Sequence, residues 1–130
     1  MKSLPYVVHT NRELGLMLRG EKPLAYFVED YSRAPESLLR YLRMFDRHAV
    51  TGRFIKREQP VACVAGMDIR YVLYALPREE WRIEKMIELV ERPGAWSADR
   101  EREFGRLLGY EDWMNDIWLA RRPVSGPGDS

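Results

Sequence analysis

The chain has 130 residues, a formal net charge of +1, and 45% hydrophobic against 32% charged residues. This size favours one domain with its own core, and the composition excludes a disordered chain. The single cysteine, Cys63, excludes an intramolecular disulfide and a cysteine-rich zinc site. We expect one domain over residues 1–122 and a disordered tail, rich in Pro, Gly and Ser, over residues 123–130.

Neither a membrane span nor a secretion signal is predicted. No stretch approaches the ~20 apolar residues that a membrane helix requires. The N-terminus lacks the continuous apolar region of a signal peptide. We therefore expect a cytoplasmic protein that does not contact the membrane.

The first part of the chain predicts two helices with a strand between them. Thr10 and Glu13 have the spacing of a capping box, which indicates a short helix over residues 11–19. The apolar run over residues 24–28 predicts a buried strand. Pro35 suits the first residue of a second helix.

The middle of the chain predicts three more strands, over residues 53–58, 61–65 and 69–76. The short connections between these strands favour antiparallel pairing. Cys63 lies in an apolar run, so it is interpreted as a small core residue.

The last part of the chain predicts three helices. The first begins at Pro77, the second runs from a Ser97 cap to Gly109, and the third covers residues 111–120 and buries Trp113. Strands in the middle with helices at both ends indicate the α+β class. We expect a central antiparallel sheet of about four strands, with an N-terminal helix and a C-terminal group of helices packed on one of its faces.

The familiar catalytic motifs are missing from this sequence. It has no phosphate-binding loop, no dinucleotide glycine fingerprint, no nucleophile elbow and no paired-histidine zinc motif. Their absence argues against the enzyme classes that depend on them, and we predict no metal site and no cofactor.

Charge is the most uneven feature of the chain. Residues 31–60 contain seven basic and three acidic residues, although the whole chain is close to neutral. Three arginines at helical spacing lie opposite the apolar stripe of the second predicted helix. The basic positions expected to share one surface are Arg40, Arg43, Arg47, Arg53 and Lys56. Such a surface can bind phosphates or an acidic protein, and the alternative is an ordinary solvated helix face.

Two tryptophans are candidate contact residues. Trp81 lies beside an acidic ridge formed by Glu80, Glu84 and Glu88 and would be an interface anchor, or else would pack against a C-terminal helix. Trp118 lies at the edge of an apolar stripe, where it would serve a homodimer or partner contact.

Two functions remain open from the sequence. The first is a small non-enzymatic interaction or regulatory protein, of the plain kind found among bacterial accessory proteins, that binds a protein partner, an anionic ligand or nucleic acid. The second is a small enzyme or ligand-binding domain with a pocket near Glu29, Asp46 and His48. A carboxylate and an imidazole two residues apart share a face on a strand and can shuttle protons there, whereas on a helix they point apart.

Overall fold

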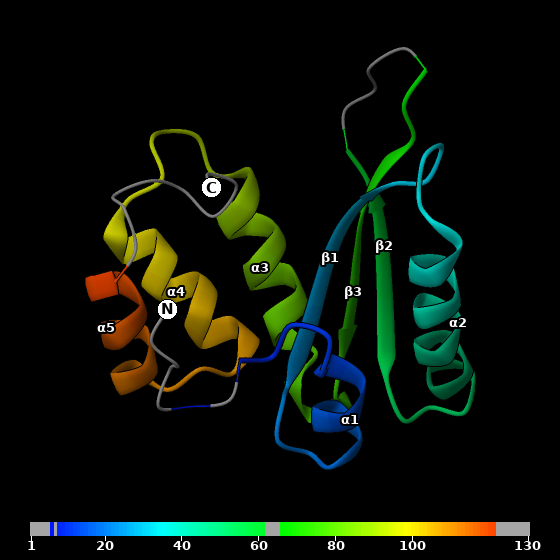
Figure 1. Cartoon of the computed structure of the whole chain (residues 1–130), viewed down its shortest axis with the longest axis horizontal. Helices are drawn as coiled ribbons and strands as arrows, with labels where there is room; N and C mark the ends of the chain where they lie inside the picture. The colour runs from blue at the N-terminus through cyan, green and yellow to red at the C-terminus, as the bar shows by residue number, and fades with distance from the viewer. Residues whose placement is uncertain (1–5, 7, 62–65, 122–130) are drawn as a thin grey trace.

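The computed structural model describes residues 6, 8–61 and 66–121 (Figure 1). Cys63 and the predicted tail over residues 123–130 therefore lie outside the described residues. The elements are α1 (Glu13–Leu18), β1 (Leu24–Asp30), α2 (Glu36–Val50), β2 (Ile55–Pro60), β3 (Ile69–Ala75), the short 3-10 helix η1 (Pro77–Glu79), α3 (Trp81–Glu91), α4 (Ala98–Leu108) and α5 (Asp112–Arg121).

The described strands form one antiparallel sheet in the order β1-β3-β2. β3, the last strand in sequence, lies in the centre of the sheet. Its residue Ala75 is paired with Leu24 of β1 on one side and with Ile55 of β2 on the other. β1 and β2 run in the same direction without pairing, and α2 connects them (Figure 1). The α+β class is confirmed, with three strands among the described residues in place of the expected four or so. The predicted strand over residues 61–65 falls almost wholly outside the described residues.

The expectation that helices cover only one face of the sheet is wrong. α1 and α2 pack on one face and α3 and α4 on the other, so two hydrophobic clusters share the sheet. Val72 and Tyr74 belong to the cluster under α2, whereas Leu73 and Ala75 belong to the cluster under α3. All four side chains are buried. A strand covered on both faces has a continuous apolar sequence, and residues 71–75 of β3 have this pattern.

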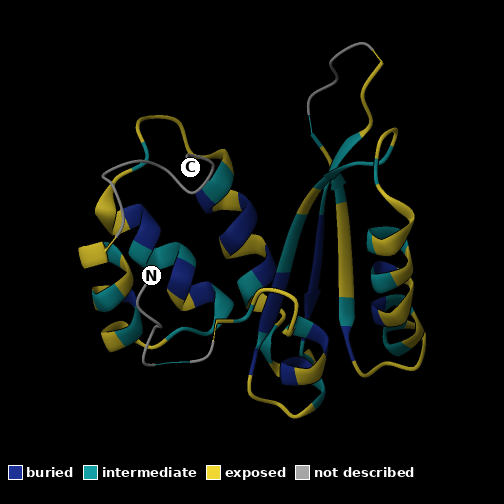
Figure 2. Ribbon diagram, in the orientation of Figure 1, coloured by how far each residue is buried: buried dark blue, intermediate teal, exposed yellow. Residues whose placement is uncertain are grey.

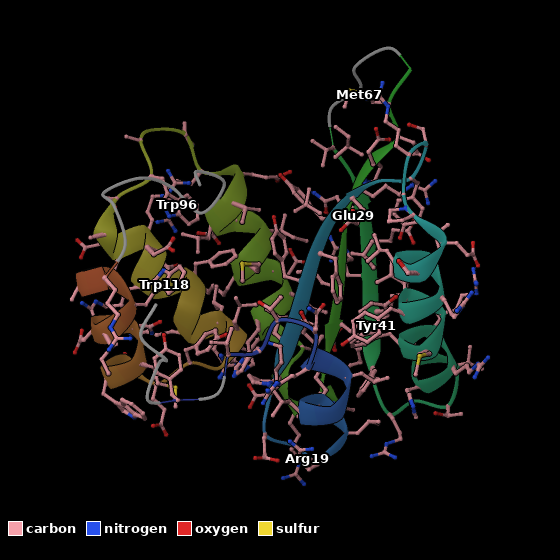
Figure 3. All side chains as sticks on the ribbon, viewed as in Figure 1. Arg19, Glu29, Tyr41, Met67, Trp96 and Trp118 are labelled. Atoms are coloured by element: carbon pink, nitrogen blue, oxygen red, sulfur yellow. The ribbon has the colours of Figure 1, made fainter. Side chains whose placement is uncertain are left out.

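Aromatic side chains fill the core between α2 and the sheet. The ring of Phe45 stacks on that of Tyr74, with 4.7 Å between centroids. Phe27 of β1 meets the Phe45 ring edge-on at 5.5 Å. Figure 3 shows Tyr41 in the same layer. Through these contacts the inner side of α2 packs against the sheet, whereas its outer side is exposed to solvent.

The predicted helix ends are partly confirmed. The Ser97 hydroxyl accepts a hydrogen bond from the Arg100 backbone N–H at 3.2 Å, as an N-cap should. The predicted capping box at α1 is wrong, because α1 has no side-chain cap. The Glu13 carboxylate instead accepts a hydrogen bond from the Tyr41 hydroxyl at 2.9 Å, which ties α1 to α2.

The inner side of α5 differs from the sequence prediction. Trp113, which we expected in the core, is exposed, and the buried residue of α5 is Asn115. Asn115 faces Gly105 of α4, whose missing side chain lets the two helices approach. The absence of a side chain at Gly105 therefore makes room for the buried Asn115.

Candidate functional site

The candidate site of this protein is the outer side of α2, which we call the α2 arginine face and define by Arg40, Arg43 and Arg47. All three are exposed, while Leu42 and Phe45 of the same helix are buried. This division follows the three-then-four spacing of the arginines. Figure 2 shows exposed positions recurring along α2.

The positive charge of this face is only partly neutralised. Arg43 Nη2 lies 2.5 Å from Glu36 Oε1, and both side chains are largely exposed. The hydrogen bond from Arg43 holds the pKa of the Glu36 carboxyl below its usual value. Arg40 and Arg47 have no ion pair with any residue that the structure describes. The face therefore keeps an excess of guanidinium charge.

Apolar side chains interrupt the arginines on the same side of the helix. Met44 lies between Arg43 and Arg47 in sequence and is exposed, and Val50 at the end of α2 is 88% exposed. Arg and Met are both enriched at protein interfaces. The composition of the face therefore differs from that of a purely charged, solvated helix surface.

The other two predicted basic residues have separate surroundings. Arg53 is exposed after the end of α2, and its Nη2 donates to the Leu18 carbonyl of α1 at 3.1 Å. Lys56 of β2 has its Nζ 2.9 Å from Asp46 Oδ1 and 3.4 Å from Glu58 Oε2. The structure thus keeps the three α2 arginines together and assigns Lys56 to an ion cluster between α2 and the sheet.

That ion cluster centres on the Asp46 carboxylate. The buried Tyr74 hydroxyl donates to Asp46 Oδ1 at 2.6 Å. Burial and this hydrogen bond raise the pKa of Tyr74 well above its usual value. Glu58 pairs with Arg70 on β3 as well as with Lys56. Each charge here has an opposite partner, which indicates a structural contact between α2 and the sheet.

The alternative site near Glu29, Asp46 and His48 does not assemble as a proton-transfer pair. Asp46 and His48 both belong to α2, and the Asp46 carboxylate is engaged by Tyr74 and Lys56. The His48 ring packs 5.4 Å from the Phe54 ring and makes no side-chain hydrogen bond to a described residue. Glu29 lies on β1, where burial raises the pKa of its carboxyl.

Trp81 begins α3 and is 54% exposed. The Arg82 guanidinium stacks over its ring at 4.7 Å. Of the acidic ridge beside it, Glu84 forms an ion pair with Arg57 of β2. The exposed Trp81 side chain is therefore accessible to a partner. The Glu84–Arg57 ion pair joins α3 to β2, an edge strand of the sheet.

The sequence does not predict that Lys22 is buried. Lys22 is only 1% exposed, and its Nζ lies 2.9 Å from both His9 Nδ1 and the Leu108 carbonyl. Burial lowers the pKa of Lys22 to about 7, against the opposing effect of Glu13. Burial and the Lys22 charge lower the pKa of His9 to about 4. A lone lysine in a turn carries no sequence signal for burial.

His9, beside Lys22, is half-buried. Its ring stacks on Tyr110 at 3.9 Å between centroids, and its backbone N–H donates to the Tyr110 hydroxyl at 2.8 Å. The segment before α1 is thereby joined to the segment after α4. Residues about a hundred positions apart make this contact, so no local pattern predicts it.

An aromatic pocket of about 320 Å³ lies among α4, α5 and the segment before α1. Its lining residues are Tyr6, Val8, Thr10, Glu101, Phe104, Gly105, Leu108, Tyr110, Asn115 and Trp118. The Glu101 carboxylate accepts hydrogen bonds from the indole N–H groups of Trp96 at 2.6 Å and Trp118 at 3.0 Å. Figure 3 shows both tryptophans on the α4 side of the molecule, away from α2.

The described residues contain no group of three or more His, Cys, Asp or Glu side chains that could hold a metal ion. None of the helices in the described ranges is long and apolar enough to cross a membrane. Comparisons with protein-family models, with curated proteins and with solved structures find no match to this chain. The candidate site is therefore defined by its geometry alone.

Proposed function

We propose that this protein is a non-enzymatic interaction or regulatory protein that binds an acidic protein surface through the α2 arginine face. The observation that carries the proposal is the exposed side of α2, where Arg40 and Arg47 form no ion pair with a described residue and Met44 is exposed between them in sequence. Guanidinium groups bind carboxylates through paired hydrogen bonds.

A protein partner fits this face better than nucleic acid does. The chain has a net charge of only +1, whereas proteins dedicated to nucleic acid usually have a strongly basic surface. Exposed Met44 and Val50 add apolar area that a protein partner can bury.

The first experiment uses poly-L-glutamate as a model acidic polypeptide and a short DNA duplex as the competing polyanion. We expect binding to poly-L-glutamate that weakens steeply with salt and disappears in the triple variant R40E/R43E/R47E. The matched control is R12E/R33E/R78E, which makes the same charge change at exposed arginines outside α2. Equal loss in both triple variants would show that net charge, and not this face, is responsible.

The second experiment looks for the natural partner. Proteins that co-purify with the chain from its native cells should be retained by the R12E/R33E/R78E control and lost with R40E/R43E/R47E. Met44→Ser should weaken the same interaction without changing any charge, because it removes apolar contact area. A partner that is retained by both R40E/R43E/R47E and Met44→Ser would contradict the assignment of this face. In the first experiment, stronger binding to the DNA duplex than to poly-L-glutamate would also contradict it.

A further inference from the structure

The aromatic pocket between α4 and α5 has features of a ligand site that are independent of α2. In Figure 1 α5 and α2 lie at opposite ends of the molecule, with the sheet between them. The pocket volume of about 320 Å³ is within the range of small-molecule sites. Trp118 at its wall is 44% exposed, and Val8 is also exposed. Solvent-exposed apolar side chains thus line the pocket.

The walls of this pocket combine aromatic rings with one carboxylate. Tyr6, Phe104, Tyr110 and Trp118 supply the rings. Glu101 is buried, and hydrogen bonds from two indole N–H groups hold its carboxylate in place. Because one of these indoles belongs to Trp118, the same side chain both lines the pocket and positions the negative charge.

We propose that this pocket binds a small organic cation of the alkylammonium class. Aromatic rings attract a cation through the negative potential of their faces, most strongly where water is excluded. The buried Glu101 carboxylate adds to this attraction through its negative charge. Arg121 acts electrostatically on Tyr6 at the pocket, which opposes a cation and makes the expected affinity modest.

The test is a titration of the full chain followed by NMR, with the indole N–H signals of Trp96 and Trp118 as reporters. The probe is choline, and the matched control is its uncharged isostere, in which a carbon atom replaces the nitrogen. Choline should shift both indole signals and bind about tenfold more tightly than the isostere, as expected for a desolvated cation beside aromatic rings. Equal affinities, or no shift of either signal, would overturn the proposal.

Variants locate the site within the molecule. Val8→Phe should weaken choline binding because it fills the pocket, whereas Val28→Phe, at an exposed position on β1 outside the pocket, should leave it unchanged. Glu101→Gln should reduce the preference for choline over the isostere. Choline binding that Val8→Phe does not affect would show that the ligand lies elsewhere. If Glu101→Gln fails to fold, the Val8 variant and the isostere still decide the question.

Discussion

Asn115 of α5 lies against Gly105 of α4 so closely that a methyl group on Gly105 would be 2.0 Å from Asn115 Oδ1. Asn115 is also one of the few buried polar residues, and its Nδ2 has no hydrogen-bond partner among the described residues. The contact between these two helices therefore depends on a glycine and tolerates an incompletely satisfied amide.

Gly105→Ala should destabilise the protein. Overpacking costs about 1–3 kcal/mol, and alanine returns about 1 kcal/mol of helix propensity, so we expect a net loss of up to about 2 kcal/mol. Urea unfolding measures this change. Gly15→Ala in α1 is the control, because a methyl group there meets nothing closer than 3.8 Å. A loss no larger than that of Gly15→Ala would contradict the close approach of α4 and α5.

Asn115→Ala should relieve the effect of Gly105→Ala. Removing the amide creates room for the methyl group, so the double variant should lose less stability than the sum of the two single losses. The measurement is a double-mutant cycle from the four free energies of unfolding. Strict additivity would show that the two residues do not share one contact.

The stability of the protein should increase between about pH 7 and about pH 9 because of Lys22. Its pKa is about 7 in the folded protein and 10.5 in its ordinary state, so the unfolded chain binds more protons in this range. Stability rises with pH wherever the unfolded state binds more protons. Above about pH 10 the tyrosines oppose this gain, because burial raises the pKa of Tyr41 to about 12.

Lys22→Met should flatten this pH dependence, since the titrating amine is removed. Urea midpoints at the two pH values, for both proteins, provide the measurement. The absolute stability of the variant is not the criterion, because methionine also removes the hydrogen bonds to His9 and Leu108. An equal slope in both proteins would refute the assignment of this effect to Lys22.

Arg100→Met should cost about 3 kcal/mol of stability, because buried carbonyl groups would lose their donor. The Arg100 guanidinium donates to the carbonyls of Leu89, Arg92, Gly94 and Ala95 and stacks over Trp96 at 4.8 Å. It thereby joins the end of α3 to the start of α4. Arg106→Met, which removes an exposed ion pair with Asp112, is the control and should lose far less. Similar losses would indicate that the carbonyl contacts contribute little.

Trp81→Ala should change stability much less than Trp96→Ala. Trp81 is more than half exposed, whereas Trp96 packs against the core under α3 and donates to Glu101. Thermal unfolding of the two variants compares them directly. A large loss in Trp81→Ala would favour the packing alternative for this residue over the interface alternative.

The elements that the sequence predicts best have strong local signals. The apolar run of β3, the Ser97 cap and the arginine spacing of α2 all depend on neighbours within a few residues. Such signals determine where an element begins and which side of it faces solvent.

The features that the sequence does not predict depend on distant contacts. Lys22 is buried at a contact with the His9 side chain and the Leu108 carbonyl group. Asn115 is buried against Gly105, which has no side chain to exclude it. The pocket is formed by rings from both ends of the chain, with Tyr6 and Trp118 as its extremes in sequence. Periodicity within one helix contains no information about these partners.

The central position of β3 has a consequence for how the protein is made. Every strand pairing in the described sheet involves β3, since β1 and β2 pair only with it. During translation the first two strands have no partner until residues 69–75 leave the ribosome. A chain that stops before residue 69 can form none of the observed strand ladders, so the sheet is completed in a single late step.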